Sequence, residues 1–546
     1  MSRLSSYSSK RTAEGNEMYS TSVENFMGGN SFELSPLQTL KIVAASSIFG
    51  EPQYYRDGVN SRKTISNPAT LAEYSIFNEL LKDKKSAADV FESAIDAALD
   101  HDFIGTLELA KELRNEYFMR LNPAVIYVRA VQHKDRVAFN EQHPGYMRSL
   151  AKMIALRPDD ITNQFDYFMF MNGSKKGMPS IMKRSWAEVL ENMSRYQLNK
   201  YKGKKLIDLV RLSHANNEII DELMTTGTLK VKDTEQTWES LRSEGKPWVV
   251  IMDTIKIPHM ALLRNLRGIF TEITERGGKT EGRSLTIKIL DDLKAGVIKG
   301  KQFPFRYWSA YKAIKNSEIE NRQLVLDALE ECMDIAVANM PKIPGKVACL
   351  SDNSGSAWGS FNSEYGSVTV AEIANLSSII TAQASDEGYV GVFGDRLSLE
   401  SVSKRNGLLT QLAETSTRGR NQGGGTENGI WLFWDDAIKN KKHYDTVFIY
   451  SDMQAGHGNL YGVNSREYRD YVHKNGGSYI DVLALVRKYR DTVNPKVNVF
   501  TVQVAGYNNN VLPENLYRGA ILAGWTGKEP AYAKAIIDAW DQAESK

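Results

Sequence analysis

The chain has few cysteines and no long apolar run. Its 546 residues include only two cysteines, Cys332 and Cys349. A disulfide framework of the kind found in small secreted domains is therefore excluded, and both cysteines are expected to be small buried residues in a reducing compartment. No stretch reaches the ~20 apolar residues that a membrane helix needs, and Met1–Lys10 is rich in serine, unlike the apolar core of a signal peptide. We therefore expect a cytoplasmic protein.

The chain also lacks a strong net charge. Its lysines and arginines nearly balance its aspartates and glutamates, which leaves a formal net charge of +2 at pH 7. With 42% hydrophobic and 25% charged residues, the composition is that of an ordinary globular protein. A chain of this length has room for about two or three domains, each with a core of its own. Composition therefore predicts a globular protein of several domains.

Strand-like patterns are scarce in residues 34–340. Apolar residues recur there at three- and four-residue spacing, which is the period of an amphipathic helix. Short connections join one helical pattern to the next, and no strict sequence period is present. Successive helical pairs of this kind predict an α-solenoid of degenerate repeats, in which each pair buries its apolar face on its neighbour. The predicted helices are Ser35–Phe49, Asn67–Lys82, Ser86–Leu99, Phe103–Leu113, Asn122–Val131, Trp186–Met193, Lys204–Ser213 and Ile257–Phe270.

The helical pattern stops at Met340–Gly345, a segment broken by prolines and a glycine. From there the chain alternates strand-like segments with helical ones, which predicts βαβ units on a doubly wound parallel sheet. The segment is therefore the predicted boundary between an α-helical part and an α/β domain. The predicted strands are Lys346–Ser351, Gly388–Phe393, Thr446–Ser451 and Val497–Val504, and the predicted helices are about Val368–Ala384, Lys404–Thr415, Glu427–Ile438 and Tyr479–Thr492.

Oxygen-bearing side chains follow several of these segments. The pattern D-x-S-x-S follows the first predicted strand, Gly423–Thr426 is a glycine-rich loop that ends in a hydroxyl, and an aspartate follows Thr446–Ser451. Because ligands bind beyond the carboxyl ends of parallel strands, these side chains are expected to converge on one crevice. Carboxylate and hydroxyl oxygens are the ligands that Mg²⁺ prefers. The predicted metal ligands are Asp352, Ser354, Ser356, Thr426 and Asp452.

The D-x-S-x-S stretch has other interpretations. Asp352 and Ser354 can form an Asx-type turn at a strand end without any metal. A serine-hydrolase elbow is excluded because no G-x-S-x-G surrounds the serines, and a P-loop is excluded because G-x-x-x-x-G-K-[ST] does not occur in the chain. The ligand set is poor in charge, which favours partner binding or a structural ion over hydrolysis. His457 is a general base only in principle.

The ligand positions resemble the metal-ion-dependent adhesion site of a von Willebrand factor A domain, over about residues 345–546. Ahead of it, several strings in order resemble the Ro autoantigen family, whose helical module is called TROVE. The most specific of them are A-L-L-R-N-L and L-x-R-L-S-H. The strings are Phe26–Gly29 with Leu37–Gly50 and Gln53–Tyr55, Leu206–His214, Ile257–Arg267, and Gln302–Arg306 leading into Ala310–Tyr311.

The chain also departs from the pattern of this family. Ala215 stands where many relatives carry proline, and the stretch Thr226–Trp248 does not follow the usual spacing. The departures indicate a distant member of the family, from a bacterium or a phage.

The resemblance implies three parts. Residues 1–25 would be a flexible N-terminus, residues 26–340 a ring of HEAT-like helical repeats, and residues 345–546 the von Willebrand factor A domain. By resemblance, the hole of the ring admits single-stranded 3′ ends of misfolded RNAs. The outer basic surface binds small non-coding Y-like RNAs, which can tether an exoribonuclease. The adhesion site is expected to hold a divalent cation, most simply Mg²⁺.

Basic residues cluster between Lys183 and Arg211, with Tyr196 and Tyr201 among them. Such a cluster can bind phosphates and stack bases, although composition alone favours a solvated helix face. The resemblance favours RNA, because the family's Y RNA surface includes the histidine of the L-x-R-L-S-H string. The predicted RNA-binding residues are Lys200, Lys202, Lys204, Lys205, Arg211 and His214.

We therefore predict a non-enzymatic RNA-binding protein that acts in RNA quality control as a ribonucleoprotein. Two other functions stay open at this point. One is a protein-interaction scaffold whose metal site binds an acidic partner. The other is an RNA-processing enzyme that uses the bound ion.

Overall fold

The structure is a computed structural model, in which the described residues form two compact units. Those up to Ser35 and from Trp238 onward belong to the first unit, and those from Pro36 to Thr237 to the second. The described residues are 22–24, 30–46, 87–201, 203–229, 237–276, 279–338, 340–355, 357–358, 360–363, 366–424, 429–451, 453, 481–504, 509–514, 516–523 and 526–545.

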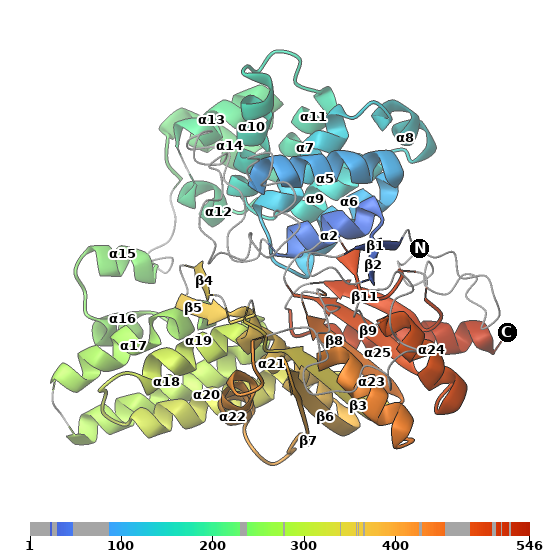
Figure 1. Cartoon of the computed structure of the whole chain (residues 1–546). Helices are drawn as coiled ribbons and strands as arrows, with labels where there is room; N and C mark the ends of the chain where they lie inside the picture. The colour runs from blue at the N-terminus through green and yellow to red at the C-terminus, as the bar shows by residue number, and fades with distance from the viewer. Residues whose placement is uncertain are drawn as a thin grey trace. The chain divides into compact units, whose positions relative to one another are not determined.

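The second unit is built of helices (Figure 1). Neighbours along the chain pack together, as α5 does with α6 and α6 with α7, and helices further apart in the sequence also pack, as α9 does with α11 and α7 with α10. This arrangement of helical pairs is the one that the apolar periodicity predicted. The helices are α2 (Pro36–Ser46), α5 (Ala87–His101), α6 (Phe103–Asn115), α7 (Leu121–Gln132), α8 (Arg136–Gln142), α9 (Tyr146–Ile154), α10 (Pro158–Asn172), α11 (Ser180–Glu191), α12 (Arg195–Lys200), α13 (Lys204–Ser213) and α14 (Glu218–Thr226).

Local sequence explains where several of these helices begin. The Asp102 carboxylate accepts a hydrogen bond from the Gly105 backbone N–H at 2.8 Å and so caps α6. Pro158 occupies the first turn of α10, where a missing N–H costs nothing. In the core between helices, the Trp186 indole N–H donates to Gln164 Oε1 at 2.7 Å, so this large buried ring keeps its polar atom satisfied.

From Trp238 onward, the described part of the first unit contains six helices before its main sheet. Helix α17 packs against α18 and α19, and α20 packs against α18 and α19. The string Ile257–Arg267 thus lies largely in α17, one residue of which, His259, is buried against Tyr307 of α19. The helices are α15 (Trp238–Ser243), α16 (Trp248–Thr254), α17 (His259–Arg276), α18 (Lys279–Gly300), α19 (Pro304–Lys315) and α20 (Arg322–Val337).

A six-stranded sheet follows in the same unit, in the spatial order β11-β9-β8-β3-β6-β7. All neighbours are parallel except β6 and β7, which are antiparallel. The chain moves from β3 to one side and later returns to build the other side from β8, so the switch point of the sheet lies between β3 and β8. The strands are β3 (Ile343–Asp352), β6 (Ser385–Phe393), β7 (Leu397–Ser401), β8 (Thr446–Ser451), β9 (Asn498–Gln503) and β11 (Gly519–Ala523).

Helices cover both faces of this sheet (Figure 1). Ala348 and Leu350 of β3 pack in one core with residues of α23 and α24. On the other face, the Tyr450 hydroxyl of β8 lies 2.7 Å from the Thr381 hydroxyl of α21, and Phe500 of β9 stacks on Trp540 of α25. The helices are α21 (Val370–Gln383), α22 (Leu408–Arg420), α23 (Gly429–Lys439), α24 (Val482–Thr492) and α25 (Glu529–Glu544).

Short strands complete the first unit. Strand β2 (Asn30–Glu33) pairs with β1 (Ser22–Glu24) and β10 (Asn509–Asn510), and β4 (Ser360–Ser363) forms a hairpin with β5 (Gly366–Thr369). These pairings join segments that carry no strong strand pattern, so they were not predicted.

The predicted fold class, helical repeats followed by a doubly wound parallel sheet, is confirmed. The strand Thr446–Ser451 and the helix Lys204–Ser213 have the predicted bounds, whereas the predicted helix Asn67–Lys82 lies outside the described residues. Strand β3 begins at Ile343, inside the predicted boundary segment, and the helices before that segment share a compact unit with the sheet after it. Within the described part of the chain, every helix is too short or too polar to cross a bilayer.

Candidate metal site and candidate RNA-binding surface

The candidate metal site begins where β3 ends. The Asp352 carboxylate is almost fully buried, and so is Ser354. Asp352 Oδ1 accepts a hydrogen bond from the Ser354 backbone N–H at 2.9 Å, and Oδ2 accepts one from the Ser451 hydroxyl at 2.7 Å. Because Ser451 is the last residue of β8, this second bond joins the carboxyl ends of the two central strands at the switch point of the sheet.

The glycine-rich loop lies beside this junction. The Gly355 backbone N–H donates to the Gly424 carbonyl at 2.8 Å, and a Cβ on Gly355 would lie only 3.3 Å from that oxygen. Gly423 has a φ of +96°, a conformation that residues with side chains rarely adopt, and a Cβ there would clash with Asp395. The D-x-S-x-S loop, the glycine-rich loop and the end of β8 are therefore neighbours.

Two of the predicted metal ligands, Asp352 and Ser354, are placed together by these contacts. The other three, Ser356, Thr426 and Asp452, lie outside the described residues. The hydrogen bond between Asp352 and Ser354 is also the Asx-type turn that was the alternative interpretation, so turn and metal site are compatible here. A buried carboxylate beside a hydroxyl is a hard-oxygen donor pair, so the described residues fit a divalent cation such as Mg²⁺.

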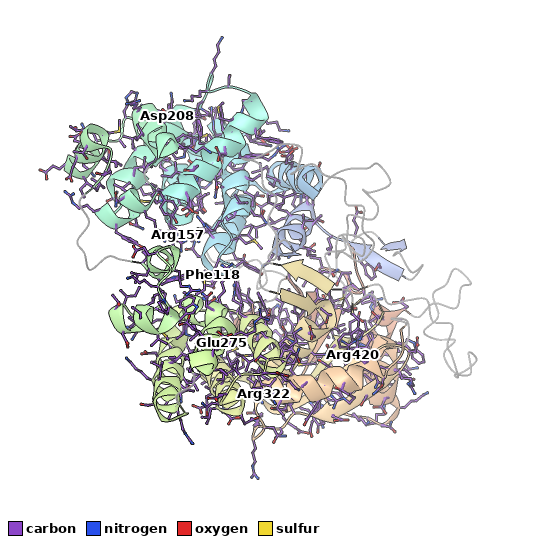
Figure 2. All side chains as sticks on the ribbon, turned by 90° about the vertical axis from the view of Figure 1, so that its left-hand side faces the viewer. Phe118, Arg157, Asp208, Glu275, Arg322 and Arg420 are labelled. Atoms are coloured by element: carbon purple, nitrogen blue, oxygen red, sulfur yellow. The ribbon has the colours of Figure 1, made fainter. Side chains whose placement is uncertain are left out.

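An aromatic residue closes one side of the loop. The Trp358 indole N–H donates to the Asn353 carbonyl at 3.0 Å. The Arg420 guanidinium, at the end of α22, lies 3.8 Å from the centre of the Trp358 ring (Arg420 is labelled in Figure 2). This cation–π contact joins the loop to α22. Sequence reasoning missed it, because no local pattern links positions 358 and 420.

The candidate RNA-binding surface is formed by α12 and α13 of the second unit. Leu206, Leu209 and Val210 are buried, so α13 turns the opposite face, with Arg211, to solvent (Asp208 marks α13 in Figure 2). His214 ends α13 in a left-handed conformation with a φ of 60° and is exposed. Arg211 and His214, two of the predicted RNA-binding residues, are therefore exposed at the end of α13.

The predicted lysines do not all have the same environment. Lys200 is exposed, with its ammonium 6.0 Å from the centre of the Tyr196 ring. Lys205 instead pairs with both oxygens of Asp166, at 2.7 and 2.8 Å. Burial raises the pKa of Asp166, and the Lys205 ammonium opposes that rise. Lys202 and the side chain of Lys204 lie outside the described residues.

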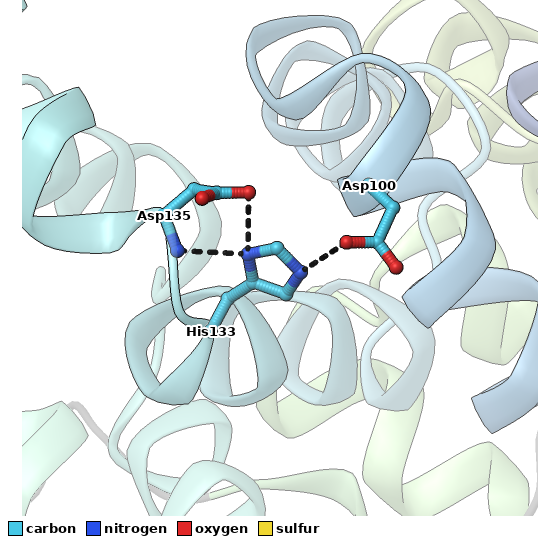
Figure 3. Close-up of side chains that lie close together, drawn as sticks. All are labelled: Asp100, His133 and Asp135. Carbon is cyan, nitrogen blue, oxygen red and sulfur yellow. Dashed lines mark hydrogen bonds and ion pairs between the residues drawn. The ribbon is translucent and has the colours of Figure 1, made fainter.

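A cluster that the sequence did not predict lies at the end of α7 (Figure 3). Asp100, His133 and Asp135 bring one ligand atom each within 4.8 Å of one another. However, the Lys134 ammonium lies 2.6 Å from Asp100, and His133 Nδ1 accepts a hydrogen bond from the Asp135 N–H at 3.2 Å. The hydrogen bond from Lys134 lowers the pKa of Asp100. The three residues therefore belong to a surface ion-pair network, in which the atoms that could bind a metal already have partners.

Comparisons with known proteins bear on part of the helical region and on the fold of the chain. Residues 224–339 match the family model described as TROVE domain. The structure is similar to the crystal structure of the Ro (RSR) protein of Deinococcus radiodurans, with a TM-score of 0.54 and 14% sequence identity, over 82% of this chain and 93% of that one. The chain has the fold of a Ro protein. The predicted resemblance to the Ro family is thereby confirmed.

The TROVE match and the Ro fold have different extents. The matched range contains α15 to α20 and includes the string Ile257–Arg267, and it also covers the stretch Thr226–Trp248, where the spacing was unusual. The string Leu206–His214 precedes the matched range. No curated protein sequence matches the chain.

Proposed function

We propose that this chain is a non-enzymatic RNA-binding protein that acts as a Ro-type ribonucleoprotein in RNA quality control. The observation that carries the proposal is the TROVE match over α15 to α20 in a chain with the Ro fold. The cytoplasm is the compartment that suits this function and the scarcity of cysteine.

Small Y-like RNAs would bind the surface of α12 and α13. Lys200, Arg211 and His214 are exposed there and can reach phosphates or bases. Lys205 contributes less, because its ammonium already neutralises Asp166. The affinity of such a surface is expected to fall steeply with salt, since each neutralised phosphate releases counterions.

Single-stranded 3′ ends of misfolded RNAs would enter a hole in a ring of the helical repeats. Recognition of a free end is a test of shape, and single-stranded RNA is commonly recognised in this way. An exoribonuclease tethered through the Y-like RNA would then degrade the selected molecule.

The metal site would hold Mg²⁺ through Asp352 and Ser354, together with Ser356, Thr426 and Asp452. When bound, the ion supplies a Lewis-acidic position that can accept a carboxylate from a partner protein. Asp352 and Ser354 are buried and hydrogen-bonded, so the protein holds its own ligands in place before any partner arrives.

The proposal is tested by titrating the full chain with structured RNA that carries a single-stranded 3′ tail, at 50 and 200 mM salt. Binding that depends on the tail and weakens with salt is expected. Equal affinity for tailed and blunt RNA would contradict recognition of the 3′ end.

A charge-reversed pair tests the outer surface. Lys200→Glu with Arg211→Glu should weaken binding of a Y-like stem–loop while tailed-RNA binding persists. The matched control reverses Arg405 and Lys441, two exposed cations of the α/β domain, and changes the net charge equally. Lys205 is left unchanged in this test, because Lys205→Glu would place a carboxylate against Asp166. Equal losses in both pairs would indicate a non-specific effect of charge.

The absence of an RNase activity is tested separately. Labelled RNA incubated with the protein and Mg²⁺ should stay intact. Cleavage that disappears in Asp352→Ala would establish the metal-dependent enzyme instead. If the chain binds an acidic protein and has no affinity for RNA, this result would establish the protein-interaction scaffold instead.

A further inference from the structure

Two carboxamides form a reciprocal pair directly beneath the D-x-S-x-S loop. Asn353, which separates Asp352 from Ser354, donates through Nδ2 to Asn375 Oδ1 at 2.9 Å. Asn375 of α21 donates back through its own Nδ2 to Asn353 Oδ1 at 3.0 Å. Both side chains are at most 1% exposed. A paired arrangement of this kind fixes the orientation of both amides, since each serves as donor and acceptor for the other.

The pair satisfies its remaining polar atoms on the surrounding elements. Asn353 Nδ2 also donates to the Ser351 carbonyl at 3.0 Å, and Asn375 Oδ1 also accepts from the Ser351 hydroxyl at 2.6 Å. Asn375 Nδ2 makes a longer contact of 3.4 Å with the Ser416 hydroxyl of α22. All four N–H groups of the two amides therefore have acceptors. A buried network that is complete in this way rigidifies its surroundings.

The backbone of Asn353 is held as firmly as its side chain. Its N–H donates to the Phe393 carbonyl at the end of β6 at 2.7 Å, and its carbonyl accepts from the Trp358 indole. On the α22 side, a Cβ on Gly419 would lie 2.0 Å from Asn353 Oδ1, so only glycine leaves room for the amide. Asn353, which lies between two proposed metal ligands, is thus held by contacts with β6, Trp358, α21 and α22.

The helix that carries Asn375 is itself anchored close by. Thr369 and Glu372 form a capping box at the start of α21, with hydrogen bonds of 3.1 and 2.9 Å. The Lys312 ammonium of α19 lies 2.8 Å from the Glu372 carboxylate. Asn375 therefore projects from a fixed helix turn, which suits a group that orients a loop.

We propose that Asn375 is a positioning residue of the metal site, which holds the loop through Asn353 so that Asp352 and Ser354 face a divalent cation in a fixed geometry. The inference rests on the proposed metal site. It extends that site to a residue of α21 that binds no metal itself. Residues that orient metal ligands in this way commonly change affinity by about 10- to 100-fold when they are replaced.

The test is a titration of the full chain with Mn²⁺, in which free Mn²⁺ is followed by electron paramagnetic resonance and thermal unfolding is recorded without metal. The wild type should bind Mn²⁺ and Asp352→Ala should not. Asn375→Ala should weaken binding by about tenfold or more. Ser378→Ala is the matched control, because Ser378 is a buried residue of the same helix whose hydroxyl has no hydrogen-bond partner among the described residues. The affinity of Ser378→Ala for Mn²⁺ should equal that of the wild type.

A double variant separates positioning from simple loss of stability. Asn375→Ala leaves the Asn353 amide buried without its partner, whereas Asn353→Ala with Asn375→Ala removes both groups and should recover part of the lost unfolding temperature. If Asn375 positions the loop, the double variant stays about tenfold or more weaker in Mn²⁺ binding despite that recovery. Affinity that recovers together with the unfolding temperature would overturn the proposal.

The remaining outcomes are also decisive. Wild-type affinity in Asn375→Ala would overturn the positioning role and leave the metal site standing. A wild type that binds no Mn²⁺ would overturn the metal site, and the positioning role with it. If Asn375→Ala does not fold, Gly419→Ala displaces Asn353 from the α22 side and should weaken Mn²⁺ binding in the same way, whereas unchanged binding in that variant would overturn the proposal.

Discussion

The D-x-S-x-S loop and the basic surface of α12 and α13 are two polar regions built in opposite ways. The loop is buried, and its contacts join β3, β8, α21 and α22, which are far apart in the sequence. The basic surface is exposed and comes from one short stretch of the chain. In the loop each polar group depends on its neighbours, whereas on the surface each cation acts almost independently. Single substitutions should therefore have large effects in the first region and graded effects in the second.

The largest effect is expected for Asp352→Ala. The change removes the carboxylate that links the two central strands and leaves the Ser451 hydroxyl without its acceptor at 2.7 Å. We expect complete loss of Mn²⁺ binding together with unchanged affinity for a Y-like stem–loop, measured on the same preparation. Weaker RNA binding in this variant would show that the two regions are not independent.

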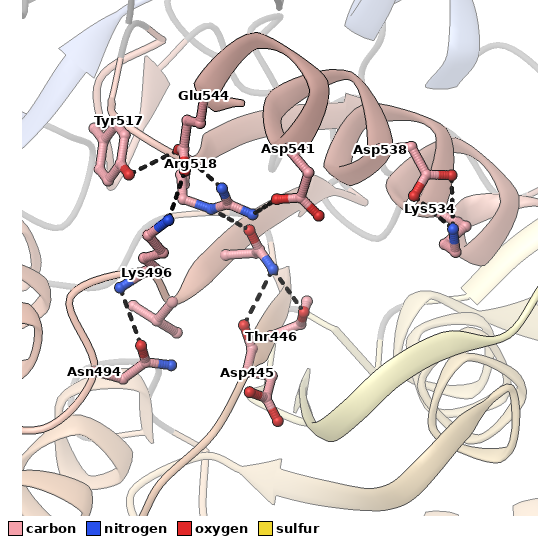
Figure 4. Close-up of polar contacts among 12 residues, drawn as sticks. Asp445, Thr446, Asn494, Lys496, Tyr517, Arg518, Lys534, Asp538, Asp541 and Glu544 are labelled. Atoms are coloured by element: carbon pink, nitrogen blue, oxygen red, sulfur yellow. Dashed lines mark hydrogen bonds and ion pairs between the residues drawn. The ribbon is translucent and has the colours of Figure 1, made fainter. Parts of the chain in front are cut away.

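A buried arginine provides the next comparison, with the exposed Arg211. The Arg518 guanidinium is 5% exposed and donates to Asn498, Asp541 and Glu544 at 2.6 to 2.9 Å (Figure 4). Because Asp541 and Glu544 are partly exposed, Arg518→Met should lower the free energy of unfolding by about 2 kcal/mol, which is less than the cost of breaking a fully buried pair. Denaturant titration measures the loss.

Lys534→Met is the control for this arginine. The Lys534 ammonium pairs with the partly exposed Asp538 on α25, the helix that carries Asp541 and Glu544, and this pair should be worth about 0.5 kcal/mol or less. The pH dependence of stability gives a second test of Arg518. Burial raises the pKa of Glu544, but hydrogen bonds from Lys496, Tyr517 and Arg518 outweigh burial and lower this pKa to about 2. Stability from this group is present above about pH 4.5 and is lost as the pH falls toward 2, so Arg518→Met should flatten that acid dependence.

Two histidines allow a smaller test. His259 is buried 2.9 Å from the Tyr307 hydroxyl, and burial lowers its pKa below 6.5, whereas His214 is exposed. The fold therefore favours neutral His259, so its contribution is complete above pH 6.5 and declines as the pH falls below that value. His259→Gln should weaken this dependence in thermal unfolding between pH 5 and 7.5, and His214→Gln should not. Parallel curves for all three proteins would contradict the assignment.

The smallest effects are expected for single alanine substitutions on the basic surface. Arg211→Ala should reduce the salt slope of RNA binding by about one, because one phosphate contact is lost. Lys205→Ala should change the slope less, since its ammonium is already paired with Asp166. Binding isotherms at several salt concentrations distinguish the two. An equal loss in both variants would mean that Lys205 leaves Asp166 to bind RNA.

The architecture was predictable because burial imposes periodicity on the sequence. Strand β8 is buried at every position and was predicted from its content of Val, Phe, Ile and Tyr, and α13 was predicted from the spacing of Leu206, Leu209 and Val210. Strands β1, β2 and β10 were not recognised, since short pairings depend on a partner strand more than on their own residues. The domain boundary, the metal ligands as a set and the RNA contacts stay predictions.

What the sequence by itself determined is the order of helices and strands, the D-x-S-x-S loop at a strand end, and a basic cluster near the end of a helix. These are local properties, set by periodicity and residue type within a few turns of chain. Only the tertiary structure decided that Asn375 meets Asn353 beneath that loop, that Ser451 holds Asp352, and that Lys205 belongs to Asp166. Such contacts depend on how distant segments pack, and no local pattern specifies them.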